Sequence, residues 1–173
     1  MSLPLRTRAL GLLALSLPLA LAACGGGSAD PKAATDAGYA ALGSGDAQAA
    51  VDHFAQALGT LKPGDPGYKR ARMGEIEAKV ALVPETAAQS FLDFARSQPD
   101  QVAADDFHKV GSQLSARGAY SPAVDVLHAG LERFAKDAKL DAAMKLTEDA
   151  VVESGDDAVL KKLAGLGYAS VSK

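Results

Sequence analysis

Apolar residues along the chain recur three and four positions apart, as in Ala87-x3-Phe91-x2-Phe94, which is the spacing of one face of a helix. Turn-forming residues divide this pattern into segments. Asp30-Pro31 suits a helix start, whereas Gly43-Ser44-Gly45-Asp46 and Lys62-Pro63-Gly64-Asp65-Pro66-Gly67 interrupt the pattern. Short turns also predict antiparallel neighbours. Eight helices are predicted, at residues 31–42, 47–61, 68–82, 84–98, 101–116, 122–136, 140–153 and 157–166.

The first 23 residues have the pattern of a targeting segment. Arg6 and Arg8 precede an apolar stretch from Ala9 to Ala23 that contains no charge. A stretch of 15 residues is shorter than the roughly 20 that a membrane-spanning helix needs, and Pro18 interrupts it. We therefore expect export without a permanent transmembrane anchor.

The chain's one cysteine, Cys24, directly follows this segment. The sequence Leu21-Ala22-Ala23-Cys24 resembles the lipobox of bacterial lipoproteins. The resemblance implies that residues 1–23 are removed and that Cys24 carries diacylglycerol through a thioether. An ordinary secretory signal cut after Ala20-Leu21-Ala22 is the alternative, and it would leave Cys24 as a free thiol.

The remaining chain divides into three parts. Residues 24–30 combine the lipidated cysteine with a flexible Gly/Ser tether, residues 31–168 form a helical domain, and residues 169–173 form a C-terminal tail. In lipoproteins an aspartate after the cysteine often signals inner-membrane retention, and here that place holds Gly25, which favours the outer membrane. With no second cysteine, the domain cannot form an internal disulfide and depends on a packed core.

Composition supports an all-α fold and excludes one class of partner. Tryptophan is absent, aromatic residues make up 5% of the chain, and alanine is frequent. All 21 acidic residues but only 16 of the 18 basic ones lie in residues 24–173, which gives that part a side-chain charge of −5. We therefore expect no nucleic-acid partner.

The helices resemble one another. Gly45-x4-Ala50-x3-Phe54-x2-Ala57 is matched by Gly118-x4-Ala123-x3-Leu127-x2-Gly130, and part of it by residues 87–94. This pattern is similar to the tetratricopeptide repeat (TPR), over about residues 34–136. The resemblance implies helical hairpins stacked in a short right-handed solenoid, whose first helices line a concave groove. Where hairpins one and three have glycine, at Gly38 and Gly111, the middle hairpin has Glu75, so we expect it to pack irregularly.

A compact helical bundle is the alternative architecture, in which the same pattern is merely good packing. Both architectures place the larger apolar residues in the core rather than in a ligand site. We expect six of them there: Phe54, Phe91, Phe94, Phe107, Leu127 and Leu131.

The sequence offers little catalytic chemistry. His53, His108 and His128 are far apart, and none has a histidine or cysteine three to five residues away on its helix, so no metal pair is predicted. Gly165-x-Gly167 follows a helix and lacks the third glycine of a dinucleotide loop. We expect no enzyme activity, cofactor or metal.

Charge marks the third helix, where basic residues outnumber acidic ones. By the TPR resemblance, the partner groove would be lined by Lys69, Arg72, Ile76, Lys79, Tyr39 and His108, accompanied by Lys32, Thr35, Asp105 and Ser112. Solvated helix faces are the alternative explanation for these charges. The expected function is a membrane-anchored adaptor or assembly scaffold that holds a segment of another envelope protein. A self-associating structural lipoprotein is the alternative, followed by a small helical enzyme.

Overall fold

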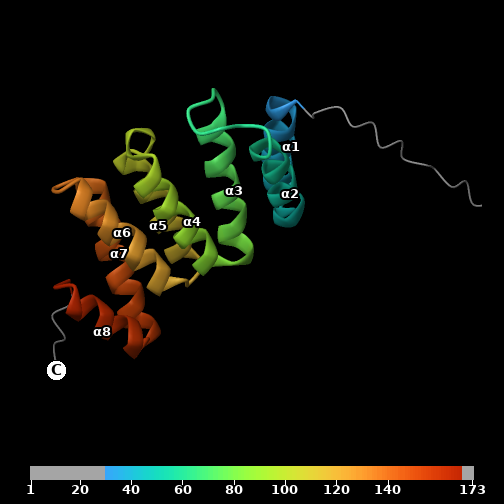
Figure 1. Ribbon diagram of the computed structural model, residues 1–173. Coiled ribbons are helices and arrows are strands. Elements are labelled where there is room, and N and C mark those ends of the chain that lie inside the picture. Colours follow the sequence, from blue (N-terminus) through green and yellow to red (C-terminus); the bar gives the residue numbers. More distant parts are fainter. Residues whose placement is uncertain (1–29, 169–173) are drawn as a thin grey trace, which may run out of the picture.

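The computed structural model describes residues 30–168, and this part of the chain is all-helical, as predicted (Figure 1). The signal segment, Cys24, most of the tether and the tail lie outside the described residues. Within them are one short 3₁₀ helix, η1 (Pro99–Gln101), and eight α-helices. These are α1 (Pro31–Gly43), α2 (Ala47–Leu58), α3 (Tyr68–Leu82), α4 (Pro84–Ser97), α5 (Ala104–Ala116), α6 (Tyr120–Arg133), α7 (Ala138–Ser154) and α8 (Asp157–Gly165).

Four helices begin with an aspartate whose side chain accepts a hydrogen bond from a backbone N–H of the first turn. The residues are Asp30, Asp46, Asp137 and Asp156. Asp30 was expected to do so. The cap predicted at Ser121 is wrong, since α6 starts one residue earlier, and Pro122 fits in its first turn, where the N–H groups lack helical partners.

Two other boundaries differ from the prediction. The segment expected from residue 101 starts instead as η1, and α5 begins at Ala104. The second helix ends at Leu58 rather than residue 61, because the N–H groups of Thr60 and Leu61 both bond to the carbonyl of Ala57. These differences leave the number and order of the helices unchanged.

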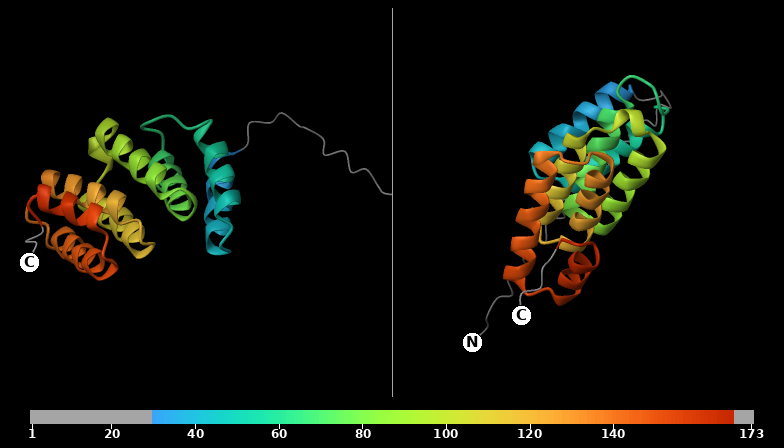
Figure 2. Two further views of the ribbon diagram at one scale, coloured as in Figure 1. Left: turned by 90° about the horizontal axis from the view of Figure 1, so that it is seen from below. Right: turned by 90° about the vertical axis from the view of Figure 1, so that its left-hand side faces the viewer.

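The helices form hairpins that follow one another in chain order, from α1–α2 at one end to α7–α8 at the other (Figure 2). The first helices of the hairpins, α1, α3, α5 and α7, pack side by side in one row. In the second row, α4 packs on α6 and α6 on α8, but α2 makes no comparable contact with α4. The first hairpin is therefore held mainly by α3.

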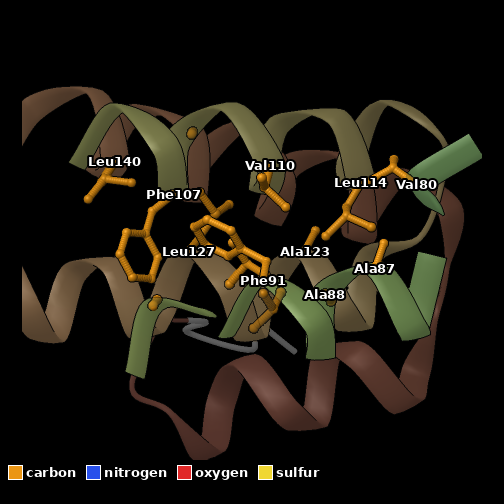
Figure 3. Packing of buried hydrophobic residues seen from close by; sticks show 14 of the residues in the cluster. Val80, Ala87, Ala88, Phe91, Phe107, Val110, Leu114, Ala123, Leu127 and Leu140 are labelled. Carbon is orange, nitrogen blue, oxygen red and sulfur yellow. The ribbon is translucent and has the colours of Figure 1, made fainter. Parts of the chain in front are cut away.

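The main core extends through α3–α8 (Figure 3). Phe91 and Phe107 meet edge to face at 4.9 Å between ring centroids, a favourable aromatic geometry. The predicted core residues Phe54, Phe91, Phe94, Phe107 and Leu127 are all buried. Leu131 is the exception: it is half-buried at the edge of the main core.

The first hairpin has its own small cores, separate from the main one. At the centre of one lies Phe54, which has no exposed surface. A Cβ atom added to Gly38 would lie 2.7 Å from the Phe54 ring, and one added to Gly74 would lie 2.4 Å from it. The ring is thus clasped between two glycines, one in its own hairpin and one on α3.

Glu75 occupies the middle hairpin's counterpart of Gly38, as expected, and only 7% of it is exposed. Its carboxylate accepts hydrogen bonds from Arg72 and Lys79, both at 2.6 Å. This hairpin, α3–α4, packs less extensively than α1–α2 and α5–α6, in agreement with the expected irregularity. We call Arg72, Glu75 and Lys79 the α3 charge cluster.

Candidate functional site

Ion pairs join each first helix to the next along one side of the row, which we call the first-helix face. Each pair links residues 32 to 37 positions apart, about one hairpin. The pairs are Asp36–Arg70 (2.7 Å), Lys69–Asp106 (2.8 Å), Glu77–Lys109 (2.7 Å) and Asp105–Lys139 (2.7 Å). Exposed pairs add little stability each, but a series of them restricts how neighbouring helices slide.

Tyr39 is fixed on this face at the first hairpin. Its hydroxyl donates to the carbonyl of Arg70 at 2.9 Å, and the Arg70 guanidinium lies 4.7 Å from the centre of its ring. Partial burial raises the pKa of Tyr39, so the hydroxyl stays protonated and remains a donor. The first hairpin and α3 are thereby held together on the exposed side as well as through Phe54.

Two hollows open on the first-helix face. One, of about 550 Å³, lies between the end of α1, α3 and α5, with Val80 and Ala81 among its apolar walls and Glu77 and Gln113 among its polar ones. The other, of about 470 Å³, lies between α5 and α7 and includes His108, Ser112 and Leu146. Leu146 is 70% exposed, which is unusual for a leucine on an otherwise polar helix side. Both hollows are large enough to receive side chains of a partner.

The structure brings together some predicted groove residues and separates others. Tyr39 and His108 lie on the first-helix face, as do Asp105 and Ser112. Lys69 bridges to α5. Ile76 is fully buried in the main core, so the prediction that it faces a groove is wrong. Thr35 is also buried, with its hydroxyl bonded to the Pro31 carbonyl.

Arg72 and Lys79 lie away from the first-helix face. Arg70 and Glu77, which make the contacts to α1 and α5, share one side of α3 because seven residues are about two helical turns. Arg72 and Lys79 are each two residues further on, which is about 200° around the helix. They therefore point to the opposite side, where both bind Glu75.

The basic residues of α3 do not form a free positive surface. Lys69 and Arg70 pair with acids of α5 and α1, and Arg72 and Lys79 pair with Glu75. Their charge is thus largely neutralised inside the chain. Sequence reasoning singled out these cations but missed Glu77, Lys109 and Leu146; for the ion pairs, the signal was opposite charges about one repeat apart.

The histidines do not converge. His53 is on α2, His108 on α5, and His128 on α6, where its Nδ1 lies 3.0 Å from the Tyr168 hydroxyl. Within residues 30–168 no group of three histidine, cysteine or acidic side chains is arranged to hold a metal ion. The polar groups of this region form structural contacts rather than a catalytic arrangement.

The ion pairs of the first-helix face predict an acid dependence of stability. Lys32 and then Arg70 lower the pKa of Asp36, and Lys139 lowers that of Asp105. Since each folded-state pKa lies below the ordinary 3.8, the stabilisation is present above that pH and is lost as the pH falls through the folded value. In Asp105→Asn, we expect thermal unfolding midpoints between pH 6 and pH 2 to fall less steeply than in the wild type.

The matched control is Asp100→Asn, which removes an exposed carboxylate of η1 for which the structure shows no ion pair. It should leave the acid dependence unchanged. Equal slopes in Asp105→Asn and the wild type would show that the Asp105–Lys139 pair contributes no pH-dependent stability.

Comparison with family models, curated proteins and solved structures gave no match to this chain. No helix between residues 30 and 168 is long and apolar enough to cross a bilayer. The geometry of the first-helix face is therefore the main guide to function.

Proposed function

We propose that this protein is a lipid-anchored, TPR-like interaction module of the bacterial cell envelope that binds a segment of another envelope protein on its first-helix face. It acts as an adaptor or assembly scaffold and has no catalytic role, cofactor, metal or nucleic-acid partner. The observation that carries this proposal is the first-helix face itself, a continuous row of four helices with two hollows and an exposed leucine.

Equivalent contacts in different hairpins support the repeat. Phe54 follows Gly38 by 16 residues and packs against it, and Leu127 follows Gly111 by the same 16 residues and packs against it. A Cβ atom on Gly111 would lie 2.5 Å from the Leu127 side chain, close to the 2.7 Å at Gly38. The same device thus closes the first and third hairpins, as expected for a short solenoid of repeated units.

The face suits a preformed binding surface. Its ion pairs and the Tyr39–Arg70 contact tie successive helices together, so little ordering is needed on binding. Leu146 and the alanines around it offer an apolar anchor point, while the flanking charges are paired. An extended or helical segment with one apolar side chain for each hollow would fit this arrangement.

Anchoring is proposed through Cys24, in the outer membrane rather than the inner one. Six residues, Gly25-Gly26-Gly27-Ser28-Ala29-Asp30, join Cys24 to α1. A flexible linker of this length has a root-mean-square span of about 13 Å. The binding face would then work close to the membrane surface, and acyl chains contributing about 0.8 kcal/mol per methylene would hold it there.

The test uses the full chain expressed in its native bacterium, with Leu146→Glu compared against Val152→Glu. Both residues are exposed on α7, at 70% and 65%, but six residues apart they lie about 120° from each other around the helix. Cross-linking followed by purification should recover a defined envelope protein with wild type and Val152→Glu. Leu146→Glu should reduce its recovery about tenfold, because a buried carboxylate without a partner is costly.

Cys24→Ser tests the anchor separately. Intact mass should show diacylglycerol on Cys24 in the wild type, and the variant should leave the membrane fraction while still binding the partner in solution. Equal recovery from Leu146→Glu and Val152→Glu would contradict binding at this face. If the chain recovers only copies of itself, the alternative, a self-associating structural lipoprotein, replaces the adaptor.

A further inference from the structure

A second groove runs along the other row of helices, between α4 and α6. Its main hollow has a volume of about 620 Å³ and continues into one of about 340 Å³, with Gln89, Leu92 and Asp125 common to both. We call the combined hollow the second-helix groove. It shares no residue with the two hollows of the first-helix face, so it is independent of the function proposed above.

Small residues on facing helices create this groove. Ala88 and Ala95 of α4 and Ala129 of α6 line it, and Phe107 of α5 closes the bottom. The lining runs from Glu85 to Arg96, which is about 17 Å or three turns of helix. An alanine floor lets another helix approach closely, within the 8–10 Å usual for packed helices. The groove thus has the length and depth for a short helix.

Its two ends differ in charge. The first turns of α4 and α6 meet at one end, with Glu85, and their last turns meet at the other, with Arg96 and Arg133. Asp125, near the first end, is already paired with Lys162 at 2.7 Å. Glu85 at one end and the two arginines at the other therefore polarise the groove along its length.

Both arginines are held in place. Arg133 donates to the Pro99 carbonyl, and its guanidinium lies 4.8 Å from the centre of the Phe134 ring. Arg96 donates to the Leu92 carbonyl and to Asp93. A guanidinium has five N–H donors, so each keeps donors for a carboxylate, and an anchored side chain loses little entropy on binding.

We propose that the second-helix groove binds an amphipathic helix of a partner protein, whose acidic first turn lies against Arg96 and Arg133. Acidic residues are favoured in the first turn of any helix because of its dipole. A helix bound in this direction runs antiparallel to α4 and α6, which is also the favourable arrangement of dipoles. Its apolar side packs on the alanine floor, and a basic last turn lies near Glu85.

The test measures fluorescence anisotropy of two synthetic 16-residue helices with the full chain. Both have alanine and leucine on one side and a staple on the other, with equal helicity checked by circular dichroism. Peptide A carries two glutamates in its first turn, and peptide B has lysines there. Peptide A should bind about tenfold more tightly than peptide B, a typical effect of two complementary charges at an interface.

Variants locate the binding. Arg96→Glu combined with Arg133→Glu should reverse the preference, so that peptide B binds more tightly, which also shows that the variant remains folded. Ala129→Phe should fill the groove and abolish binding of peptide A, whereas Ala142→Phe, the same change in a first-helix hollow, should not.

Three results would overturn the proposal. Peptides A and B could bind the wild type equally, or Ala129→Phe could leave binding intact. In the third, sedimentation shows self-association that Ala129→Phe abolishes, which would make the occupant a second copy of this chain. Loss of peptide A with Ala142→Phe alone would place helix binding on the first-helix face and equally exclude the second-helix groove.

Discussion

Replacing Phe54 with alanine is expected to lower the free energy of unfolding of the first hairpin by about 4 kcal/mol, the usual cost of deleting a buried aromatic ring. Phe54 has no exposed surface, and its ring fills the space between Gly38 and Gly74 and meets Tyr39 at 5.0 Å between ring centroids. Two glycines cannot close the cavity, because they have no side chains that could move into it. Domains are stable by only about 5–15 kcal/mol, so this loss is large.

The loss should be local. The small cores that hold α1 and α2 are separate from the main core, and α2 makes little contact with α4. Hydrogen exchange of Phe54→Ala should therefore show protection lost in α1 and α2 but retained in α5, α6 and α7. The measurement should be made at several denaturant concentrations, so that local and global opening are distinguished.

Leu127→Ala is the matched control. Leu127 occupies the equivalent position in the third hairpin, against Gly111, but belongs to the main core. Its removal should cost about 2–5 kcal/mol and lower protection throughout α3–α8. If Phe54→Ala instead lowers protection evenly along the whole chain, the first hairpin is not a separate unit of stability.

Local sequence signals determined most of the fold. Proline, glycine and aspartate at the turns predicted all eight helices, and Asp30 was correctly expected to cap the first. The glycine–Phe54 and glycine–Leu127 spacing indicated which helices pair closely, because only glycine leaves room for those side chains. These features depend on residues near one another in the chain, so spacing alone reveals them.

The candidate site was less accessible to the same reasoning, because it depends on how each helix is rotated within the stack. Lys69, Arg72, Ile76 and Lys79 form one stripe on a helical projection, yet Ile76 is buried and Arg72 and Lys79 bind Glu75. The rotation is set by packing against neighbouring helices, which one helix cannot show. Opposite charges spaced by about one repeat, such as Asp36 and Arg70 or Asp105 and Lys139, contain that missing information.

Replacing Glu75 with leucine is expected to destabilise the protein by about 3 kcal/mol, although leucine is the more apolar residue. Glu75 is 7% exposed and is the acid bound by both Arg72 and Lys79, whose side chains are 27% and 21% exposed. Without it, two partly buried cations lie side by side with no compensating charge, and one of their donors, Nε of Arg72, already lacks a partner. Chemical denaturation of the full chain measures the loss.

The triple variant Arg72→Met, Glu75→Leu, Lys79→Met separates charge from packing. Replacing a whole buried ionic group by apolar residues of similar volume is usually neutral or stabilising, by about 1–4 kcal/mol. The triple variant should therefore recover at least the stability of the wild type, because it removes the desolvation of three charges in the hairpin where the other two have glycine. A triple variant as unstable as Glu75→Leu would mean that the ion pairs themselves hold α3 in place. In that case the α3 charge cluster, rather than a lack of space for Glu75, would determine how the middle hairpin packs.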